Sequence, residues 1–320
     1  MKTFSYTDIL NETIKRYVNG DYKGAYTFIT EEAPKVVTNL AQIYNFRYAI
    51  ASKMGDVELS INLLREAVED HEFWYSYEYL MEDDDLEPIR NTPVFKELAN
   101  TCKEREIRTK KSTQPQLKVI EPKENEDTNQ LLIGLHGNQE NIEVVEEYWT
   151  SQEFNGYTVA LPQSSEIEFA TGYVWEDIEQ GAKELKAHYA QLTALKATPY
   201  SQVTIGAFSA GADVALEALV RGYIRANRLI LIAPWFADLD RLSNNMAKLK
   251  ELGVLIYMVC GDADEDCFQS TDAFAELLDD HEIPYEFAII EGLDHTYPRP
   301  FNSVLNHCIS YFNHFNEDVD

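Results

Sequence analysis

One five-residue stretch, residues 207–211, constrains the fold of this chain more than any other. It follows an apolar run, residues 202–206, and precedes residues 212–220, whose apolar pattern is typical of a buried helix. The order predicts a strand, a sharp turn and a helix, with Ser209 at the apex of the turn. Small residues on both sides of the serine let the strand and the helix approach closely. A serine held in this way is a candidate nucleophile.

Two more polar side chains follow predicted strands farther along the chain. Residues 254–260 and 285–290 are apolar runs typical of strands, and Asp264 and His295 come soon after them. Parallel strands carry their ligand crevice at their carboxyl ends, so these side chains should meet Ser209 there. An imidazole can take the proton of a serine hydroxyl, and a carboxylate can fix the imidazole tautomer. The sequence therefore predicts a catalytic triad in the order Ser209, Asp264, His295.

The carboxylate is the least constrained member of this triad. Asp264 is the favoured residue, and Asp262, which is nearer to the strand end, is the alternative. Because some triads take their acid from the preceding strand, Asp238 and Asp240 are further alternatives.

A turn after another predicted strand, residues 130–135, is the expected oxyanion site. Backbone N–H groups aimed at the developing negative charge of a tetrahedral intermediate are worth about 3 kcal/mol each. We expect the N–H of Ala210, directly after the nucleophile, and that of Asn138 to supply them. His136 is expected to be a structural histidine, because His295 holds the better catalytic position.

Together these motifs resemble those of α/β-hydrolases, most closely the dienelactone-hydrolase-like and phospholipase/carboxylesterase-like branch. The matching stretches are Leu135-His136-Gly137-Asn138, Ala207-Phe208-Ser209-Ala210-Gly211, Gly261-Asp262-Ala263-Asp264 and Gly292-Leu293-Asp294-His295. Ala207 stands where glycine is usual. The resemblance implies an α/β fold with a doubly wound, mostly parallel sheet and no metal or other cofactor. It also implies hydrolysis of esters, thioesters or amides through an acyl-enzyme.

The loop after a further predicted strand, residues 157–160, carries two aromatic residues. In hydrolases of this kind that loop often lines the acyl or leaving-group pocket, so Trp175 and Tyr173 are candidate substrate contacts. The alternative is that both are ordinary packing aromatics.

The first third of the chain has a different pattern. Before about residue 116 its apolar residues recur at helical spacing, which predicts a small all-α domain of helical hairpins over residues 1–112. Glycine-punctuated turns at Gly20 and Gly55 lie 35 residues apart, near the tetratricopeptide period. The region therefore resembles tetratricopeptide repeats, and a plain helical bundle is the alternative. Stacked hairpins often bind partners, so a protein or peptide partner is expected here.

The hydrolase domain is expected over residues 113–320. Residues 103–115 are first charged and then turn-like, and we interpret them as the linker between the two domains. Their short basic run is interpreted as a solvated helix end. Residues 121–129 are polar and are predicted to form a hairpin connection between the first two strands of the hydrolase domain.

Composition limits the partners of the chain. Its formal charge of −28 argues against nucleic acid and anionic membrane surfaces. The sequence has no run of about 20 apolar residues that could span a membrane, and its first residues lack a secretory apolar core. A cytoplasmic location is therefore expected. Four cysteines are too sparse for a disulfide framework and lack paired metal spacing. Cys260 is expected to be a buried apolar side chain, and Cys267 to have no catalytic role.

Three functions fit these observations. The first is a carboxylesterase-like serine hydrolase that cleaves a small carboxylic ester or thioester, with Ser209 as nucleophile, His295 as general base and acid, and Asp264 as the orienting carboxylate. The second is a peptidase or amidase of the same fold. The third is a non-catalytic protein that binds a partner through its helical domain.

Overall fold

The structure is a computed structural model that describes residues 4–35, 38–123, 126–194 and 196–317. Its internal contacts divide the chain into two compact units. We call the first the helical unit; it comprises Met1–Gln114, Gln139–Asn141 and Glu166–Val174. The second, the sheet unit, comprises Pro115–Asn138, Ile142–Ser165 and Trp175–Asp320.

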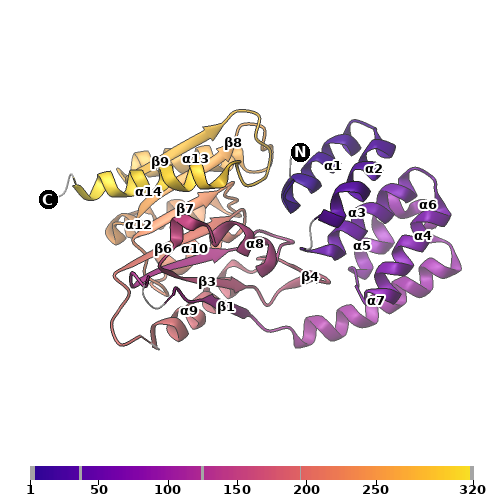
Figure 1. Ribbon diagram of the computed structural model, residues 1–320, viewed down its shortest axis with the longest axis horizontal. Coiled ribbons are helices and arrows are strands. Elements are labelled where there is room, and N and C mark those ends of the chain that lie inside the picture. Colours follow the sequence, from indigo (N-terminus) through magenta and orange to yellow (C-terminus); the bar gives the residue numbers. More distant parts are fainter. Residues whose placement is uncertain (1–3, 36–37, 124–125, 195, 318–320) are drawn as a thin grey trace. The chain divides into compact units, whose positions relative to one another are not determined.

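The sheet unit is built on seven strands in the order β1-β3-β2-β6-β7-β8-β9 (Figure 1). Their bounds are β1 (Gln116–Ile120), β2 (Gln130–Leu135), β3 (Tyr157–Gln163), β6 (Gln202–Phe208), β7 (Arg228–Ile232), β8 (Leu255–Gly261) and β9 (Tyr285–Ile290). All neighbours pair in parallel except β1, which runs antiparallel to β3. Strands β2, β6, β7 and β8 are almost wholly buried, as expected of parallel strands covered on both faces.

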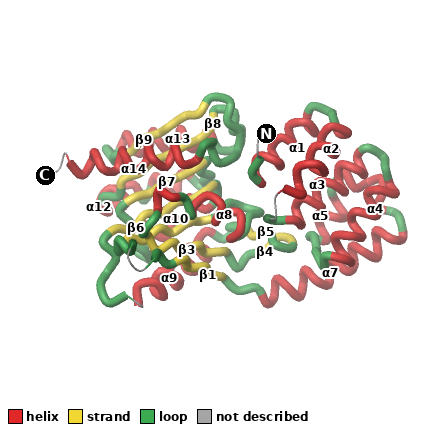
Figure 2. Tube along the Cα trace, in the orientation of Figure 1, coloured by secondary structure: helices red, strands yellow, loops and turns green. Residues whose placement is uncertain are grey.

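Helices lie on both faces of this sheet (Figure 2). They are α8 (Ile142–Trp149), α9 (Ile178–Ala194), α10 (Gly211–Val220), α11 (Leu239–Ser243), α12 (Met246–Leu252), α13 (Phe268–Asp280) and α14 (Phe301–Glu317). Apolar residues of α9, α10, α12 and α13 share one core with the strands. Trp149 of α8 instead packs edge-on against Phe301 of α14. The predicted α/β class with a doubly wound, mostly parallel sheet is confirmed.

The predicted hairpin over residues 121–129 was wrong; residues 124–125 lie outside the described part of the chain. Strands β1 and β2 are not neighbours, because β3 lies between them and pairs with both. Polar turn residues mark a change of direction but do not say which strand the chain pairs with next.

The helical unit is built mainly from α-helices. They are α1 (Tyr6–Val18), α2 (Tyr22–Glu32), α3 (Leu40–Lys53), α4 (Val57–Arg65), α5 (Tyr77–Glu82), α6 (Glu87–Arg90) and α7 (Pro93–Ser112). Gly20 and Gly55 adopt φ values of +78° and +80°, and the aspartate after each glycine caps the next helix. The predicted all-helical region is confirmed, whereas its tetratricopeptide ancestry stays a prediction.

Two segments from the hydrolase part of the sequence belong to the helical unit. The second holds a small ribbon of β4 (Ile167–Phe169) and β5 (Gly172–Tyr173). Phe169 is buried in the apolar cluster of the helices, and the Ala170 N–H donates a hydrogen bond to Trp74 O (2.9 Å). Neither insertion was predicted from the sequence.

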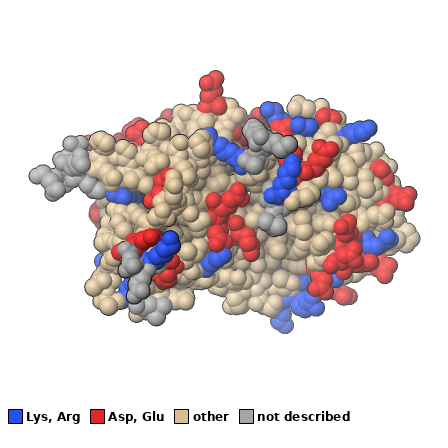
Figure 3. Space-filling model, in the orientation of Figure 1, with Lys and Arg blue, Asp and Glu red and all other residues tan. Residues whose placement is uncertain are grey.

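Acidic and basic side chains are interspersed on the face of the molecule in Figure 3. Most ion pairs of the described residues are between partly exposed groups, such as Lys118 with Glu146. Among the described helices, none combines the length and the apolar character that crossing a bilayer requires.

Candidate active site

Ser209 lies at the turn between β6 and α10, one residue after the strand ends. Its φ of 50° is in the left-handed region, which side-chain-bearing residues rarely adopt. Gly211 permits the turn, because a Cβ there would lie 2.6 Å from His136 O. The neighbouring strand end braces the serine on both sides: its N–H donates to Ile232 O (3.0 Å), and its O accepts from Trp235 N (3.1 Å).

The structure brings Ser209, Asp264 and His295 together. His295 Nε2 lies 3.1 Å from Ser209 Oγ, and His295 Nδ1 lies 2.8 Å from Asp264 Oδ2. In the neutral ring, a proton on Nδ1 is donated to the carboxylate, which leaves Nε2 to accept the serine hydroxyl. Each residue follows the carboxyl end of its own strand, β6, β8 or β9, which is the edge where the sequence placed them.

Of the four carboxylates considered for this position, Asp264 is the one at the imidazole. It is 1% exposed, and its Oδ1 also accepts from the Cys267 N–H (3.0 Å). Asp262 is exposed and accepts from the Gly292 N–H (2.6 Å). Asp238 caps α11, and Asp240 lies in the first turn of that helix.

The Phe208 ring packs against the imidazole of His295, a contact that was not predicted from the sequence. Its ring lies 4.9 Å from the His295 ring and is stacked on Tyr297 at 4.4 Å. The aromatic residue directly before the serine was the available signal in the sequence.

The turn after β2 approaches the serine closely. A Cβ on Gly137 would lie 3.1 Å from Ser209 Cβ, so only glycine brings the turn this near. Among the described residues, no acceptor takes the N–H of Asn138 or of Ala210. Two donors beside the nucleophile are thus unused.

His136 is fully buried at the start of this turn and is a structural residue, as predicted. Its Nε2 accepts from the Ser164 N–H (3.1 Å), and its Nδ1 lies 2.7 Å from Gly137 O. Burial lowers the pKa of His136 to about 4, so the ring is neutral near pH 7.

Trp175 is a buried aromatic residue, as in the alternative interpretation, and its side chain is not exposed to contact a substrate. It is 2% exposed, stacks on the His136 ring at 4.6 Å, and donates from Nε1 to His136 O (2.8 Å). Its backbone N–H donates to Asn138 Oδ1 (2.8 Å), so it holds the turn. Tyr173 is partly buried against the apolar cluster of the helical unit, and its N–H donates to Glu140 O (2.9 Å).

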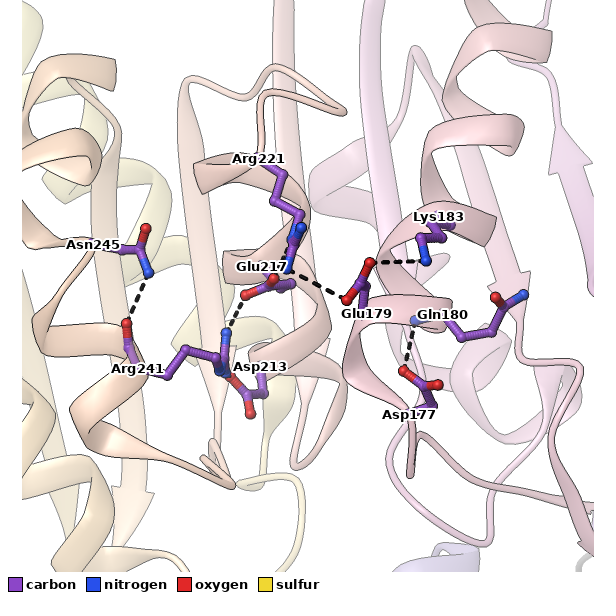
Figure 4. Close-up of polar contacts among 9 residues, drawn as sticks. All are labelled: Asp177, Glu179, Gln180, Lys183, Asp213, Glu217, Arg221, Arg241 and Asn245. Carbon is purple, nitrogen blue, oxygen red and sulfur yellow. Dashed lines mark hydrogen bonds and ion pairs between the residues drawn. The ribbon is translucent and has the colours of Figure 1, made fainter.

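A buried ion-pair network lies on the helix that follows the nucleophile (Figure 4). Arg241 of α11 contacts both Asp213 and Glu217, which lie one turn apart on α10 and are 0% and 4% exposed. Asp213 also accepts from the Ala237 N–H (3.1 Å). Burial raises the pKa of Asp213, and Arg241 opposes this. The signal in the sequence was two acids four residues apart in an otherwise apolar helix.

Comparison with known proteins identifies the fold family. The sequence-family model of the A/B hydrolase-like N-terminal domain matches residues 5–110 of this chain. An uncharacterized protein from Bacillus cereus ATCC 10987 is 41% identical over 97% of this chain and 100% of that one, with a TM-score of 0.55. The chain belongs to the same family as the Bacillus cereus protein. Its sheet unit has the fold of α/β-hydrolases.

Two more distant α/β-hydrolase structures show the same fold. Acyl-protein thioesterase 2 from Zea mays is 16% identical, covering 62% of this chain and 99% of that one, with a TM-score of 0.50. Esterase PE8 is 16% identical, covering 61% and 97%, with a TM-score of 0.51. No curated protein matches the sequence.

Proposed function

We propose that this α/β-hydrolase is a serine hydrolase that cleaves a small carboxylic ester or thioester through an acyl-enzyme. The observation that carries the proposal is the position of the His295 ring, which lies within hydrogen-bond reach of Ser209 on one side and Asp264 on the other.

The proposed reaction has two halves. Nε2 of His295 takes the Ser209 proton as Oγ attacks the acyl carbon, and then returns a proton to the departing alcohol or thiol. Water attacks the acyl-serine by the same route in the second half. Asp264 holds the imidazole in one orientation and stabilises the imidazolium.

The backbone N–H groups of Ala210 and Asn138 are the proposed oxyanion donors. Both flank the nucleophile and have no acceptor among the described residues. Donors that need no reorganisation stabilise the tetrahedral oxyanion most, and removal of one such donor typically costs about 10²–10³-fold in kcat.

The ester or thioester class is proposed from this chemistry and from the fold neighbours. Two of them are an acyl-protein thioesterase and an esterase. A peptidase or amidase would use the same three side chains, so the substrate panel below must decide between them.

Covalent labelling with a fluorophosphonate tests the nucleophile. We expect the wild type to be labelled once, Ser209→Ala to be unlabelled, and Ser201→Ala, which changes an exposed serine of the sheet unit, to be labelled at the wild-type rate. Labelling that persists in folded Ser209→Ala, or its absence in folded wild type, would contradict the proposal.

A substrate panel tests the class. Rates on p-nitrophenyl esters of increasing chain length and on acyl thioesters are compared with rates on aminoacyl p-nitroanilides. We expect kcat/KM to be higher on the esters and thioesters, and a preference for the anilides would overturn the class while leaving Ser209 as the nucleophile.

A further inference from the structure

The acid of the triad stands beside a thiol that the proposed reaction does not use. Cys267 directly precedes α13, is 1% exposed and is a free cysteine. Three potential metal-ligand atoms lie within 4.8 Å of one another: a carboxylate oxygen of Asp264, Sγ of Cys267 and a ring nitrogen of His295. Only the backbone N–H of Cys267 donates to Asp264, and any residue at this position could supply it. This hydrogen bond therefore does not explain why the side chain at position 267 is a thiol.

The thiol is chemically silent by itself. Burial, together with the charge of Asp264, raises the pKa of Cys267 well above the usual thiol range. A second buried thiol, Cys260, has its Sγ 3.8 Å from Asp264 Oδ2. Neither sulfur is therefore poised as a nucleophile, whereas a metal ion can deprotonate a thiol that it coordinates.

The three ligand types suit one class of ion. Thiolate and imidazole together select Zn²⁺ and similar thiophilic ions over Mg²⁺ or Ca²⁺. Zn²⁺ bonds are about 2.0–2.3 Å long, so ligand atoms of one tetrahedron lie about 3.3–3.8 Å apart. The present Nδ1 to Oδ2 distance of 2.8 Å would have to widen by about half an ångström, and the sulfur would have to move inward.

We propose that Asp264, Cys267 and His295 form an inhibitory Zn²⁺ site inside the catalytic centre. The ion binds the Asp264 carboxylate, the Cys267 thiolate and Nδ1 of His295, and water fills the fourth position. The His295 side chain is 29% exposed, whereas those of Asp264 and Cys267 are buried, so the ion enters past the imidazole.

Proton accounting explains the inhibition. The Cys267 thiol proton goes to solvent, and the imidazole proton leaves Nδ1 and is replaced by one on Nε2. Each bound ion thus releases one net proton. An imidazole with metal on Nδ1 and a proton on Nε2 cannot accept the Ser209 proton, so hydrolysis stops. This inhibitory part rests on the proposed function, whereas binding of the ion does not.

The test is a Zn²⁺ titration of the whole 320-residue chain after treatment with a chelator, followed by competition with a chromogenic chelator. Millimolar Mg²⁺ is present throughout, so that carboxylates on this acidic surface hold a hard ion instead. We expect one Zn²⁺ per chain, release of one proton, and loss of ester hydrolysis over the same concentration range.

Cys267→Ala is the decisive variant, and Cys308→Ala, which removes another buried thiol of the sheet unit, is its matched control. We expect Cys267→Ala to hydrolyse esters normally without metal, to bind Zn²⁺ at least tenfold more weakly and to resist inhibition. Cys308→Ala should bind Zn²⁺ as the wild type does.

Equal Zn²⁺ affinity of the wild type and Cys267→Ala would overturn the site. If the wild type hydrolyses none of the substrates, the proposed function fails, but chelator competition and the Cys267 dependence still decide the binding. Cd²⁺ gives an independent reading: a sulfur-to-metal ultraviolet band should appear in the wild type and be absent in Cys267→Ala.

Discussion

At the residue scale, two carboxylates in one loop have opposite environments. Asp264 is buried against His295 and accepts from the Cys267 N–H, whereas Asp262 is exposed and faces Gly292. A carboxylate can orient an imidazole only when it accepts the proton of the far ring nitrogen, and burial strengthens this interaction. Position in space, and not distance from the strand end, distinguishes the two.

Replacing each acid by its amide tests this distinction. For Asp264→Asn we expect kcat to fall roughly 10⁴-fold, the loss typical when the triad carboxylate becomes an amide and the imidazole takes the wrong tautomer. Asp262→Asn should retain activity within about threefold, because its side chain is exposed and an amide oxygen can still accept from the Gly292 N–H. Ester hydrolysis by both variants is the measurement, and equal losses would refute the assignment of Asp264.

A second prediction concerns His136 and the pH dependence of the free energy of unfolding. Its folded pKa, about 4, lies below the ordinary value of 6.5, so protons bind the unfolded chain first as the pH falls. Neutral His136 therefore contributes at most about 3 kcal/mol to the free energy of unfolding. This contribution is fully present above pH 6.5 and is lost as the pH falls from 6.5 to 4. Urea unfolding of wild type and His136→Gln at several pH values measures this.

The difference between the two proteins isolates His136 from the many carboxylates, which titrate in both. We expect the stability advantage of the wild type to shrink as the pH falls through this window. A difference that does not vary with pH would show that the ring is protonated equally easily in both states.

What the sequence could predict at this scale followed from local rules. Ser209, Asp264 and His295 each come just after an apolar strand, so their shared edge was predictable. The burial of Trp175 was not, because an aromatic loop residue fits a pocket wall and a packed interior equally well until its neighbours are known.

At the scale of elements, α10 depends on a buried ion-pair network. Asp213 and Glu217 face Arg241 of α11, and Asp213 holds the Ala237 N–H two residues beyond Trp235, the donor to Ser209 O. The network therefore connects the nucleophile helix to the segment that braces the nucleophile (Figure 4).

Removing the cation should destabilise this pair of helices. For Arg241→Met we expect a loss of about 3–5 kcal/mol in the free energy of unfolding, because the buried Asp213 loses its counter-charge and the buried Glu217 keeps only the exposed Arg221. Arg221→Met, which removes an exposed partner of the same Glu217, should cost much less. Chemical denaturation compares the two, and equal losses would show that the buried pairs contribute no more than the exposed one.

Elements themselves were predictable wherever local chemistry decides them. The Gly20 and Gly55 turns were visible because a glycine with positive φ ends one helix and an aspartate caps the next. The pairing of β1 with β3 was not visible, because strand order depends on contacts between segments far apart in the sequence.

At the scale of the whole molecule, the two units are not consecutive in the sequence. The chain enters the helical unit again at Gln139–Asn141 and at Glu166–Val174. Asn39 links both segments, because its Nδ2 donates to Gln139 O (2.8 Å) and its Oδ1 accepts from Thr171 Oγ1 (3.0 Å). A boundary near residue 112, as the sequence suggested, would therefore separate these segments from helices that bury them.

Expression of residues 113–320 alone tests this arrangement. Without the helices, Ile167 and Phe169, now 7% and 5% exposed, lose their apolar cluster, and exposed apolar patches promote aggregation. We expect this fragment to bind a hydrophobic dye and to elute as oligomers. The same fragment with Ile167→Ser and Phe169→Ser should do both less, because the exposed apolar surface is removed. A monodisperse fragment that binds no dye would mean that the inserted segments need no helical partner, and that the hydrolase part of the chain folds without the first third.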